Sequence, residues 1–393
     1  MFRQDLETAA LRDIDAVRAL RAEWHALLAA SGTAELFQTH EWLSAWWQVF
    51  GGGGRRPFVV TVRHRGRLVG VAPFLIRTIH RLGPMSVRRL ELIGTGEAEP
   101  DEVCSDFLDI LALPEHAQVI SQRVWEHLAQ EGHRWDEARF VNVLESSNLA
   151  RFLGVEAQRR GGEAVIESRR QRFFVDLSVG DFDKYLATLS KKRRRRLAYD
   201  RRRLTRDGDF VEHRPRDRDE IAPFLNEVAR LNRLRRSSRR KPSAFASARF
   251  RRFHELVAHA LWEQGALELR LWRLRDRYVA AGYNFVYNGT VYHYQSGFDA
   301  AAFGNSSVGT LTLTDGIRGA MERGLRRFDF QIGAAGSYKE DYGCQTEPVV
   351  VMVLYNRTAA AKTIQLARRV RGAVKELARA LPRRLAAWRA WRA

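Results

Sequence analysis

Hydrophobic and polar residues near the C-terminal end of the chain predict a strand, a helix and a second strand in succession. The alternation from Val291 to Phe298 is typical of a half-buried strand. A helix capped by the hydroxyl of Thr310 or Thr312 is expected next, and Gly324 stops it because glycine adopts positive φ without strain. The second strand is expected from Arg327 to Ile332.

The start of this predicted helix offers a place for an anion. Its first N–H groups have no partner within the helix, and together with the helix dipole they favour a phosphate. The candidate donors are the N–H groups of Gly309, Thr310 and Leu311, with added hydroxyls from Ser306 and Ser307. After the second strand, glycines break the chain into a polar turn that carries Tyr338, Lys339, Asp341 and Tyr342.

Two hairpins of similar pattern indicate that the chain contains two copies of one α/β unit. The first joins residues 58–63 to 68–76, and the second joins 267–274 to 278–287. The first copy is expected to continue with a strand near 106–111, a helix over 114–130 and a strand near 137–144. It has no counterpart of the Tyr338-Lys339 turn, so we expect it to serve as scaffold or substrate wall.

The remaining pattern is mostly helical. Helices are expected over 12–30, after a Thr39 cap with Trp42 and Trp46 buried, over 221–234 and over 245–264. Residues 145–170 have the composition of a polar connection, followed by a short strand at 173–177. A last strand at 349–355 is expected to complete the second sheet.

Residues 191–203 carry nine basic side chains and one acid, Asp200. Leucines at spacings near 3.5 predict a helix with a narrow apolar stripe. A solvated helix face explains this pattern as well as a site for an anionic substrate or for RNA phosphates does. The candidate substrate contacts are Lys191, Lys192 and Arg195, together with Gln295 on the predicted strand.

Residues 359–393 predict a basic amphipathic helix that is kinked at Pro382. Its apolar face would carry Leu366, Val370 and Val374, and arginine and lysine cover the other side. Such a helix can lie on an anionic membrane surface or pack on a protein, and the pattern leaves both open.

Length and composition narrow the class of protein. A chain of 393 residues is expected to form two domains. There is no apolar run long enough to span a bilayer, no signal-peptide pattern and only two cysteines, which together favour a cytoplasmic protein. The net charge of +20 indicates an anionic partner. No spacing typical of a metal site is present, so no metal is expected.

Four motifs give the stretch from Tyr292 to Gly343 a resemblance to a known family. They are Val308-Gly309, the run from Ala320 to Gly324, Asp329-Phe330 leading to Gly333, and Tyr338-Lys339. The stretch resembles GNAT-type acyltransferases of the CelD-like or BioF2-like group, which are related to the FemABX aminoacyl transferases. The family's usual proline before the loop glycine is Val308 in this chain. The resemblance covers roughly residues 35 to 355.

The resemblance implies an α/β fold with two tandem GNAT-like units, each a mixed β-sheet flanked by helices. We expect a degenerate N-terminal unit over 1–150, the acyltransferase unit over 151–358, and the basic C-terminal helix over 359–393. It also implies an N- or O-acyltransferase that moves an acyl group directly from an acyl-CoA co-substrate, such as acetyl-CoA. The acceptor would be anionic or glycan-like, as in polysaccharide biosynthesis.

For the catalytic residues, the resemblance directs attention to the polar turn and the strand before it. Lys339 would stabilise developing negative charge, and Tyr338 or Tyr342 would donate a proton to the leaving thiolate. Asp329 would orient Lys339 or act as the base. The residues 306, 307 and 309–311 named above would hold the acyl-CoA.

Two other readings stay open. One is a FemABX-like aminoacyl transferase that uses charged tRNA, and the other is a non-catalytic scaffold at a membrane surface. For location, we expect the cytoplasm, with peripheral attachment to the inner membrane face as an open alternative.

Overall fold

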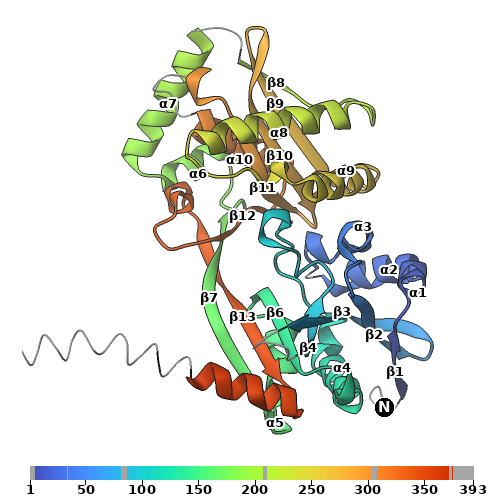
Figure 1. The fold of residues 1–393 in the computed structure, drawn as a ribbon. Helices are drawn as coiled ribbons and strands as arrows, with labels where there is room; N and C mark the ends of the chain where they lie inside the picture. The colour runs from blue at the N-terminus through green and yellow to red at the C-terminus, as the bar shows by residue number, and fades with distance from the viewer. Residues whose placement is uncertain are drawn as a thin grey trace, which may run out of the picture.

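The computed structural model describes residues 5–32, 34–80, 86–206, 210–302, 308–370 and 374. It is an α/β protein with a 13-stranded mixed sheet that runs through two halves (Figure 1). The strand order is β1-β2-β3-β4-β6-β13-β7-β12-β11-β10-β9-β8, with β5 paired to β3. The predicted fold class of two α/β units is confirmed.

The N-terminal half contains the following strands and helices: β1 (Leu6–Leu11), α1 (Ile14–Ala19), α2 (Arg21–Ser31), α3 (His40–Phe50), β2 (Arg56–His64), β3 (Arg67–His80), β4 (Ser86–Leu92), β5 (Leu111–Ala112), α4 (Ala117–Gln130), β6 (Glu137–Leu144) and α5 (Gly154–Arg159). The Thr39 hydroxyl accepts a hydrogen bond from the Trp42 amide, so the predicted cap of α3 is confirmed. The chain expected to form a strand from Asp106 is irregular, and only Leu111–Ala112 is a strand. Positive φ at Phe107 interrupts the extended conformation there.

The C-terminal half contains α6 (Phe182–Thr188), α7 (Lys191–Arg206), β8 (Phe210–His213), α8 (Ile221–Ser237), α9 (Ala248–Trp262), β9 (Leu267–Leu274), β10 (Arg277–Tyr287), β11 (Thr290–Phe298), α10 (Val308–Glu322) and β12 (Arg327–Gly333). Gly324 follows α10 with φ of 69°, as predicted. The predicted cap at Thr310 or Thr312 is wrong, because α10 already begins at Val308. The Thr312 hydroxyl instead donates back to the Val308 carbonyl.

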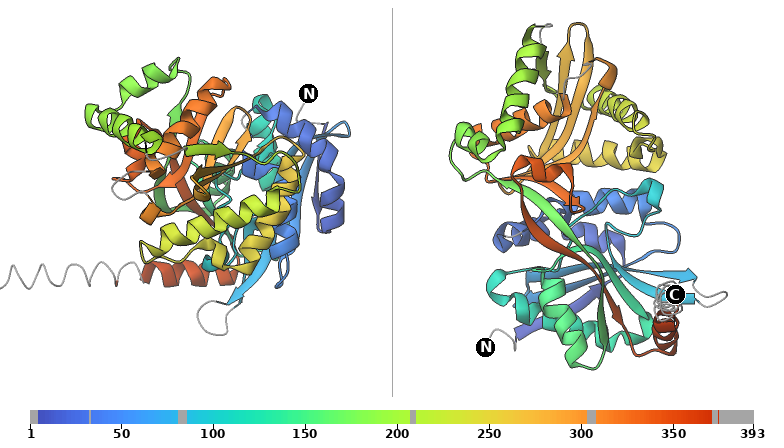
Figure 2. Two further views of the ribbon diagram at one scale, coloured as in Figure 1. Left: turned by 90° about the horizontal axis from the view of Figure 1, so that it is seen from above. Right: turned by 90° about the vertical axis from the view of Figure 1, so that its left-hand side faces the viewer.

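Two long strands, β7 (Glu163–Asp176) and β13 (Gln345–Tyr355), run from one half to the other (Figures 1 and 2). β13 pairs with β7 on one side and with β6 on the other, whereas the end of β7 pairs with β12. The last strand therefore joins the sheet of the first half, contrary to expectation. Since the halves share these strands, the boundary at residue 150 stays a prediction.

The prediction of a polar connection over 145–170 is also wrong, because β7 begins at Glu163. Residues 166–170 of this strand are exposed to solvent. A strand with both faces in water carries polar residues on both faces, so it lacks the alternation by which strands are recognised.

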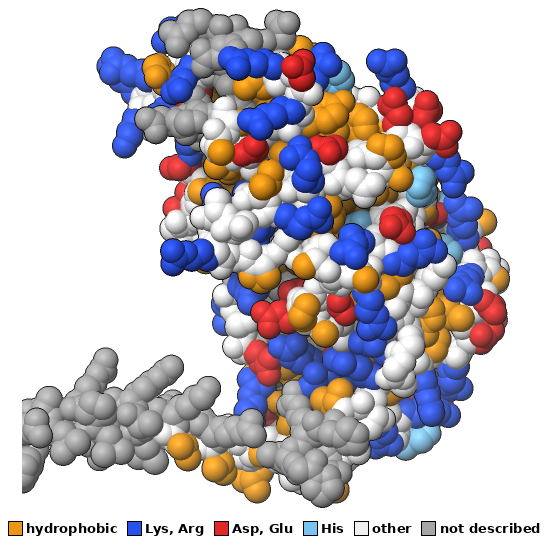
Figure 3. Space-filling model, turned by 45° about the horizontal axis from the view of Figure 1, so that its top comes forward, with side chains coloured by type: hydrophobic (Ala, Val, Ile, Leu, Met, Phe, Trp, Pro, Cys, Tyr) orange, Lys and Arg blue, Asp and Glu red, His pale blue; other side chains and the backbone are white. Residues whose placement is uncertain are grey.

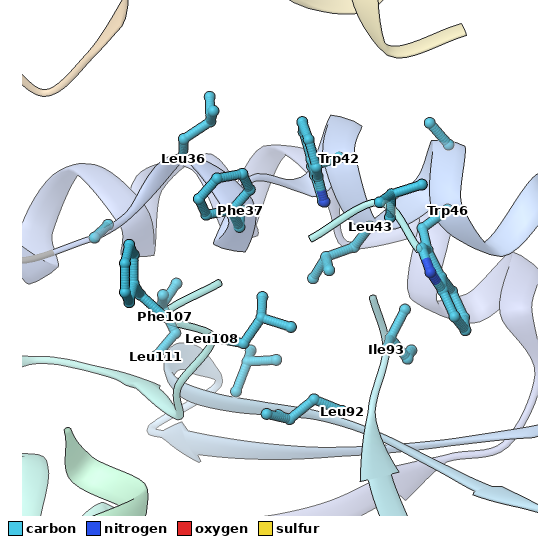
Figure 4. Close-up of a cluster of buried hydrophobic side chains, with 14 of the residues drawn as sticks. Leu36, Phe37, Trp42, Leu43, Trp46, Leu92, Ile93, Phe107, Leu108 and Leu111 are labelled. Carbon is cyan, nitrogen blue, oxygen red and sulfur yellow. The ribbon is translucent and has the colours of Figure 1, made fainter. Parts of the chain in front are cut away.

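The two halves meet through a hydrophobic core built on aromatic side chains of the N-terminal half. Figure 4 shows Phe37, Trp42 and Phe107 in this cluster. Trp42 is fully buried, and its ring lies 4.9 Å from Phe253 of α9 and 5.5 Å from Phe285 of β10. The burial predicted for Trp42 and Trp46 is confirmed, and it holds α3 against the C-terminal half.

The last described helix covers residues 359–370. Ala361 and Ile364 pack against Tyr355 and Val87, so the start of the helix is fixed to the sheet. Leu366, Val370 and Val374 are exposed. The rest of the predicted helix lies outside the described residues. No described helix is long and apolar enough to cross a membrane.

Candidate functional site

The parallel strands β11 and β12 separate after three paired positions. Thr290, Val291 and Tyr292 pair with residues 327–329, and no later position of β11 pairs with β12. Each strand also has a bulge at this point: Tyr294 is an extra residue relative to β10, and Phe330 is an extra residue relative to β7. Bulges leave backbone groups free and are common beside active sites. The opening between β11 and β12 is therefore the centre of the candidate site.

Two polar side chains lie in this opening. The Gln331 amide donates to the His293 carbonyl across it, at 3.1 Å. The Lys339 ammonium donates to the carbonyls of Phe330 at 2.6 Å and Ile332 at 2.7 Å. Lys339 thus binds two carbonyls of β12, on either side of Gln331.

Lys339 is nearly buried and is not paired with the acids beside it in sequence. Asp341 pairs with Arg193, and Glu340 accepts from the Gly336 amide. Burial lowers the pKa of Lys339, while the nearby carboxylates of Asp329 and Asp106 oppose that shift. Its catalytic role stays a prediction, and its structural role in holding β12 is evident.

Asp329 is fully buried in a network that joins the two halves. Its carboxylate accepts from Arg172 Nε at 2.6 Å, and Arg172 also donates to Glu35 of the N-terminal half at 2.6 Å. The Tyr292 hydroxyl donates to the same Glu35. Burial raises the pKa of Asp329, and the Arg172 guanidinium acts against this. Because its oxygens accept hydrogen bonds from Arg172 and from the backbone N–H of Gln331, Asp329 is better placed to hold the strands than to accept a proton.

The two predicted tyrosines differ in their surroundings. Tyr338 is half-exposed, whereas Tyr342 is buried against Phe330. The Tyr342 hydroxyl bonds the Thr310 side chain in the first turn of α10, and burial raises its pKa to about 12. Tyr342 therefore keeps its proton at neutral pH and lies beside the predicted anion site.

A buried carboxyl that the sequence analysis did not single out lies in the loop between β4 and β5. Asp106 is 4% exposed and accepts a hydrogen bond from the Asn142 amide at 2.9 Å. Burial raises its pKa to about 7, and the Lys339 ammonium partly offsets that rise. A carboxyl with a pKa near 7 suits a general base. Because the sequence predicted a strand at 106–111, Asp106 was not identified as a candidate site residue.

Several non-glycine residues near Asp106 have strained backbone conformations. Cys104, Phe107, Asn142 and Gln331 all have positive φ, between 49° and 62°, although none is glycine. This conformation is costly for a residue with a side chain and tends to occur at functional sites.

Two cavities are lined by residues close to Asp106, although Asp106 itself lines neither. The larger, of about 640 Å³, lies between the halves where β11 and β12 begin, and Arg172 lines it. The Arg172 guanidinium lies 4.1 Å from the centre of the Phe107 ring. The smaller, of about 300 Å³, lies in the N-terminal half and is lined by Ser105 and Asn142.

The predicted acyl-CoA residues that the structure describes lie next to the end of β11. Gly309, Thr310 and Leu311 form the first turn of α10. A Cβ on Gly309 would lie 2.9 Å from the Phe298 ring at the end of β11, so glycine permits this close approach. Ser306 and Ser307 lie outside the described residues.

The predicted substrate contacts are less central. Lys191, Lys192 and Arg195 are exposed on α7, whose Arg193 pairs with Asp341 and so places the helix beside the polar turn. Basic side chains are spread widely over the face drawn in Figure 3. Gln295 lies on β11 and accepts from the Asn232 amide of α8 at 3.2 Å. Whether these residues bind a substrate stays a prediction.

The described residues hold no cluster of side chains that could bind a metal ion. The two cysteines are poor nucleophiles, because burial raises the pKa of Cys344 to about 12 and that of Cys104 well above its usual value.

Comparison with known proteins places this geometry in context. Residues 191–340 match the family model described as acetyltransferase (GNAT) domain. The chain is similar in structure to FemX, with 12% identity and a TM-score of 0.61 over 92% of this chain and 99% of that one. A search of curated proteins found no matching sequence.

Two further solved structures have lower scores. L-PGS from Bacillus licheniformis has 14% identity and a TM-score of 0.49 over 90% of this chain and 96% of that one. The tandem GNAT protein from the clavulanic acid biosynthesis pathway has 13% identity and a TM-score of 0.47 over 90% and 99%. At these identities the comparison with FemX establishes the fold alone.

Proposed function

We propose that this chain, a GNAT-type acyltransferase with the fold of FemX, moves an acyl group from an acyl-CoA to an amine or hydroxyl acceptor. The observation that carries the proposal is the opening between β11 and β12, with the start of α10 against the end of β11 and with Lys339, whose charge acts on the pKa of Asp106, bound to β12. The thioester would lie in this opening. Backbone N–H groups freed by the bulge at Tyr294 would stabilise the oxyanion, an effect typically worth about 3 kcal/mol.

The first turn of α10 would hold the phosphates of the donor. The N–H groups of this turn have no acceptor within the helix, and with the dipole of the 15-residue helix they favour a pyrophosphate at Gly309 to Leu311. The Tyr342 hydroxyl, bound to Thr310, is placed near this turn and would protonate the departing thiolate.

Asp106 would accept the proton of the acceptor. Its pKa of about 7 makes it partly ionised at neutral pH. The ionised carboxylate can then take a proton from the acceptor. Lys339 would keep β12 in place and favour the ionised form of Asp106. The high pKa of both cysteines supports direct transfer without a thioester on the enzyme.

A specific observation also favours the second candidate, an aminoacyl transferase that uses charged tRNA. The exposed cations Lys191, Lys192 and Arg195 form part of α7, which lies beside the polar turn and could contact a polyanion. Binding through such contacts falls steeply with salt concentration.

A thermal-shift titration separates these donors. Acetyl-CoA at 100 times its Kd should stabilise the folded chain by about 2.7 kcal/mol, and a tRNA pool should have a weaker effect that disappears at high salt. Salt-sensitive stabilisation by charged tRNA, with no response to acetyl-CoA, would favour the aminoacyl transferase over the acyl-CoA-dependent acyltransferase.

The exposed residues Leu366, Val370 and Val374 support a further part of the proposal, peripheral attachment to an anionic membrane. A chain truncated after Gln365 keeps Ala361 and Ile364, which pack on the sheet. We expect the truncated chain to stay folded but no longer to co-sediment with vesicles that contain anionic lipid. Unchanged sedimentation would exclude this helix as the attachment. If the truncated chain also keeps acetyl transfer, the scaffold reading is excluded.

A further inference from the structure

The smaller cavity, of about 300 Å³, is a second polar site in the N-terminal half. It lies on the face of the sheet formed by β3, β4, β6, β7 and β13, and the turn at Gly94–Gly96 closes one side. Its volume corresponds to about ten water molecules, which is enough for a small polar head group.

One wall of this cavity presents guanidinium groups. The side chain of Arg89 is 9% exposed and forms ion pairs with Glu137 at 2.6 Å and with Glu91 at 3.6 Å, but its buried Nη2 has no hydrogen-bond partner among the described residues. Arg170 lies at the same cavity on β7 and has no ion-pair partner among the described residues. A buried guanidinium N–H calls for an acceptor, and an oxyanion suits it best.

The other arginines of the lining are already compensated. Arg77 donates two hydrogen bonds to Glu91, at 2.6 and 3.0 Å, and Arg139 donates to Glu167 at 3.2 Å. Arg170 is thus the arginine of the lining without an ion pair among the described residues, and together with the unpartnered Nη2 of Arg89 it defines the arginine wall.

The opposite wall is acidic and includes Ser105, next to Asp106 in the chain, and Asn142, whose amide donates to Asp106. Glu97 and Glu102 line it together with Cys104, whose thiol pKa is raised by burial and further by the carboxylates of Asp106, Glu102 and Glu97. Glu97 accepts hydrogen bonds from Trp46 Nε1 and the Val103 amide, so it faces inward. Glu102 is exposed at the rim, where it can attract an incoming ammonium group.

We propose that this cavity binds an amine acceptor that carries a phosphate or carboxylate. The oxyanion binds the arginine wall, and the amine points towards Asp106. This inference rests on the proposed function. In the reaction, the neutral amine nitrogen forms a bond to the acyl carbon and passes one proton to Asp106. The carbon–sulfur bond breaks, and CoA leaves with its electron pair and takes up a proton as the free thiol.

The test is calorimetric titration of the full chain with D-glucosamine 6-phosphate and with D-glucosamine, and with phosphate and acetate as simple anions. We expect the phosphorylated amine to bind at least tenfold more tightly than glucosamine. A preference for phosphate or for acetate identifies the kind of oxyanion. Arg170→Ala should weaken anion binding at least tenfold, and Arg89→Lys should do the same by removing the buried Nη2.

The matched control is Arg169→Ala. Arg169 is the neighbour of Arg170 on β7, lies outside the cavity lining and pairs with Glu145. If Arg89→Lys fails to fold, the exposed Arg170 still decides the question. Equal binding of both amines, or wild-type anion binding by Arg170→Ala, would overturn the proposal. The titrations contain no acyl-CoA, so retained anion binding without acyl transfer would refute only the proposed function.

Discussion

Asp106 and Lys339 show how burial can give ordinary side chains special properties. Asp106 comes from the N-terminal half and Lys339 from the turn after β12, and each affects the pKa of the other. Neither faces open water, so their charges are costly and their protonation depends on the surroundings. The two roles differ: Asp106 is the proposed base, and Lys339 holds the backbone of β12.

Replacing Asp106 should therefore affect the reaction more than the fold. Asp106→Asn is expected to lower turnover at least a hundredfold while leaving the Kd for acetyl-CoA unchanged. In the wild type, turnover should rise as pH increases through about 7, because only the carboxylate accepts a proton. The pH–rate profiles of both proteins provide the measurement, and a wild-type profile in Asp106→Asn excludes Asp106 as the base.

The same raised pKa makes a prediction about stability. The folded state holds a proton on Asp106 that the unfolded chain releases near pH 4, so this group favours folding at low pH. That stability is lost as pH rises through about 7. At pH 8, Asp106→Asn should increase the free energy of unfolding by roughly 1–3 kcal/mol. Urea titrations at pH 5 and 8 measure it, and a gain no larger at pH 8 than at pH 5 contradicts the assignment.

Substitution of Lys339, in contrast to that of Asp106, should lower the free energy of unfolding. Lys339→Met leaves the carbonyls of Phe330 and Ile332 without a donor, so we expect a loss of about 3 kcal/mol in the free energy of unfolding. Glu340→Ala is a control in the same turn. If Lys339→Met unfolds at the wild-type urea concentration, the ammonium does not support β12.

At the scale of elements, α10 is the helix whose first turn lies against the end of β11. Gly309→Ala should destabilise the fold and weaken acetyl-CoA binding, because its Cβ would lie 2.9 Å from the Phe298 ring. Gly319→Ala in the same helix meets no atom within 4 Å and should stabilise it by about 0.5–1 kcal/mol. Thermal unfolding and titration of both variants test this, and equal effects would show that the contact with Phe298 is unimportant.

Most elements could be predicted from sequence because they have a regular period. The strand β11 and the end of α10, just before Gly324, lie where alternation and glycine indicate. The exposed β7 could not be found, since its polar residues show no period of two. Asp106 was missed for a related reason: its loop takes positive φ at Phe107, and no local pattern signals that strain. The pairing of β13 with the first half depends on contacts far apart in sequence.

At the scale of the whole molecule, the two halves are joined by shared strands and by buried charge. Arg172 on β7 binds Asp329 of β12 and Glu35 of the N-terminal half. Removing one member of such a network leaves the others buried without a partner. Arg172→Met should therefore lower the free energy of unfolding by about 3–5 kcal/mol.

A double-mutant cycle gives the test of this network. Adding Asp329→Asn to Arg172→Met should recover part of the loss, because it removes one uncompensated carboxylate. Additive losses would mean that the two residues stabilise the fold independently.

The central claim is that the acyl donor binds between β11 and β12, and hydrogen exchange with and without acetyl-CoA tests it most directly. We expect acetyl-CoA to slow amide exchange in residues 293–298 and 308–312, while α4, on the far side of the N-terminal half, stays unchanged. Saturable binding that protects other segments, or no protection anywhere at saturating acetyl-CoA, would contradict the claim.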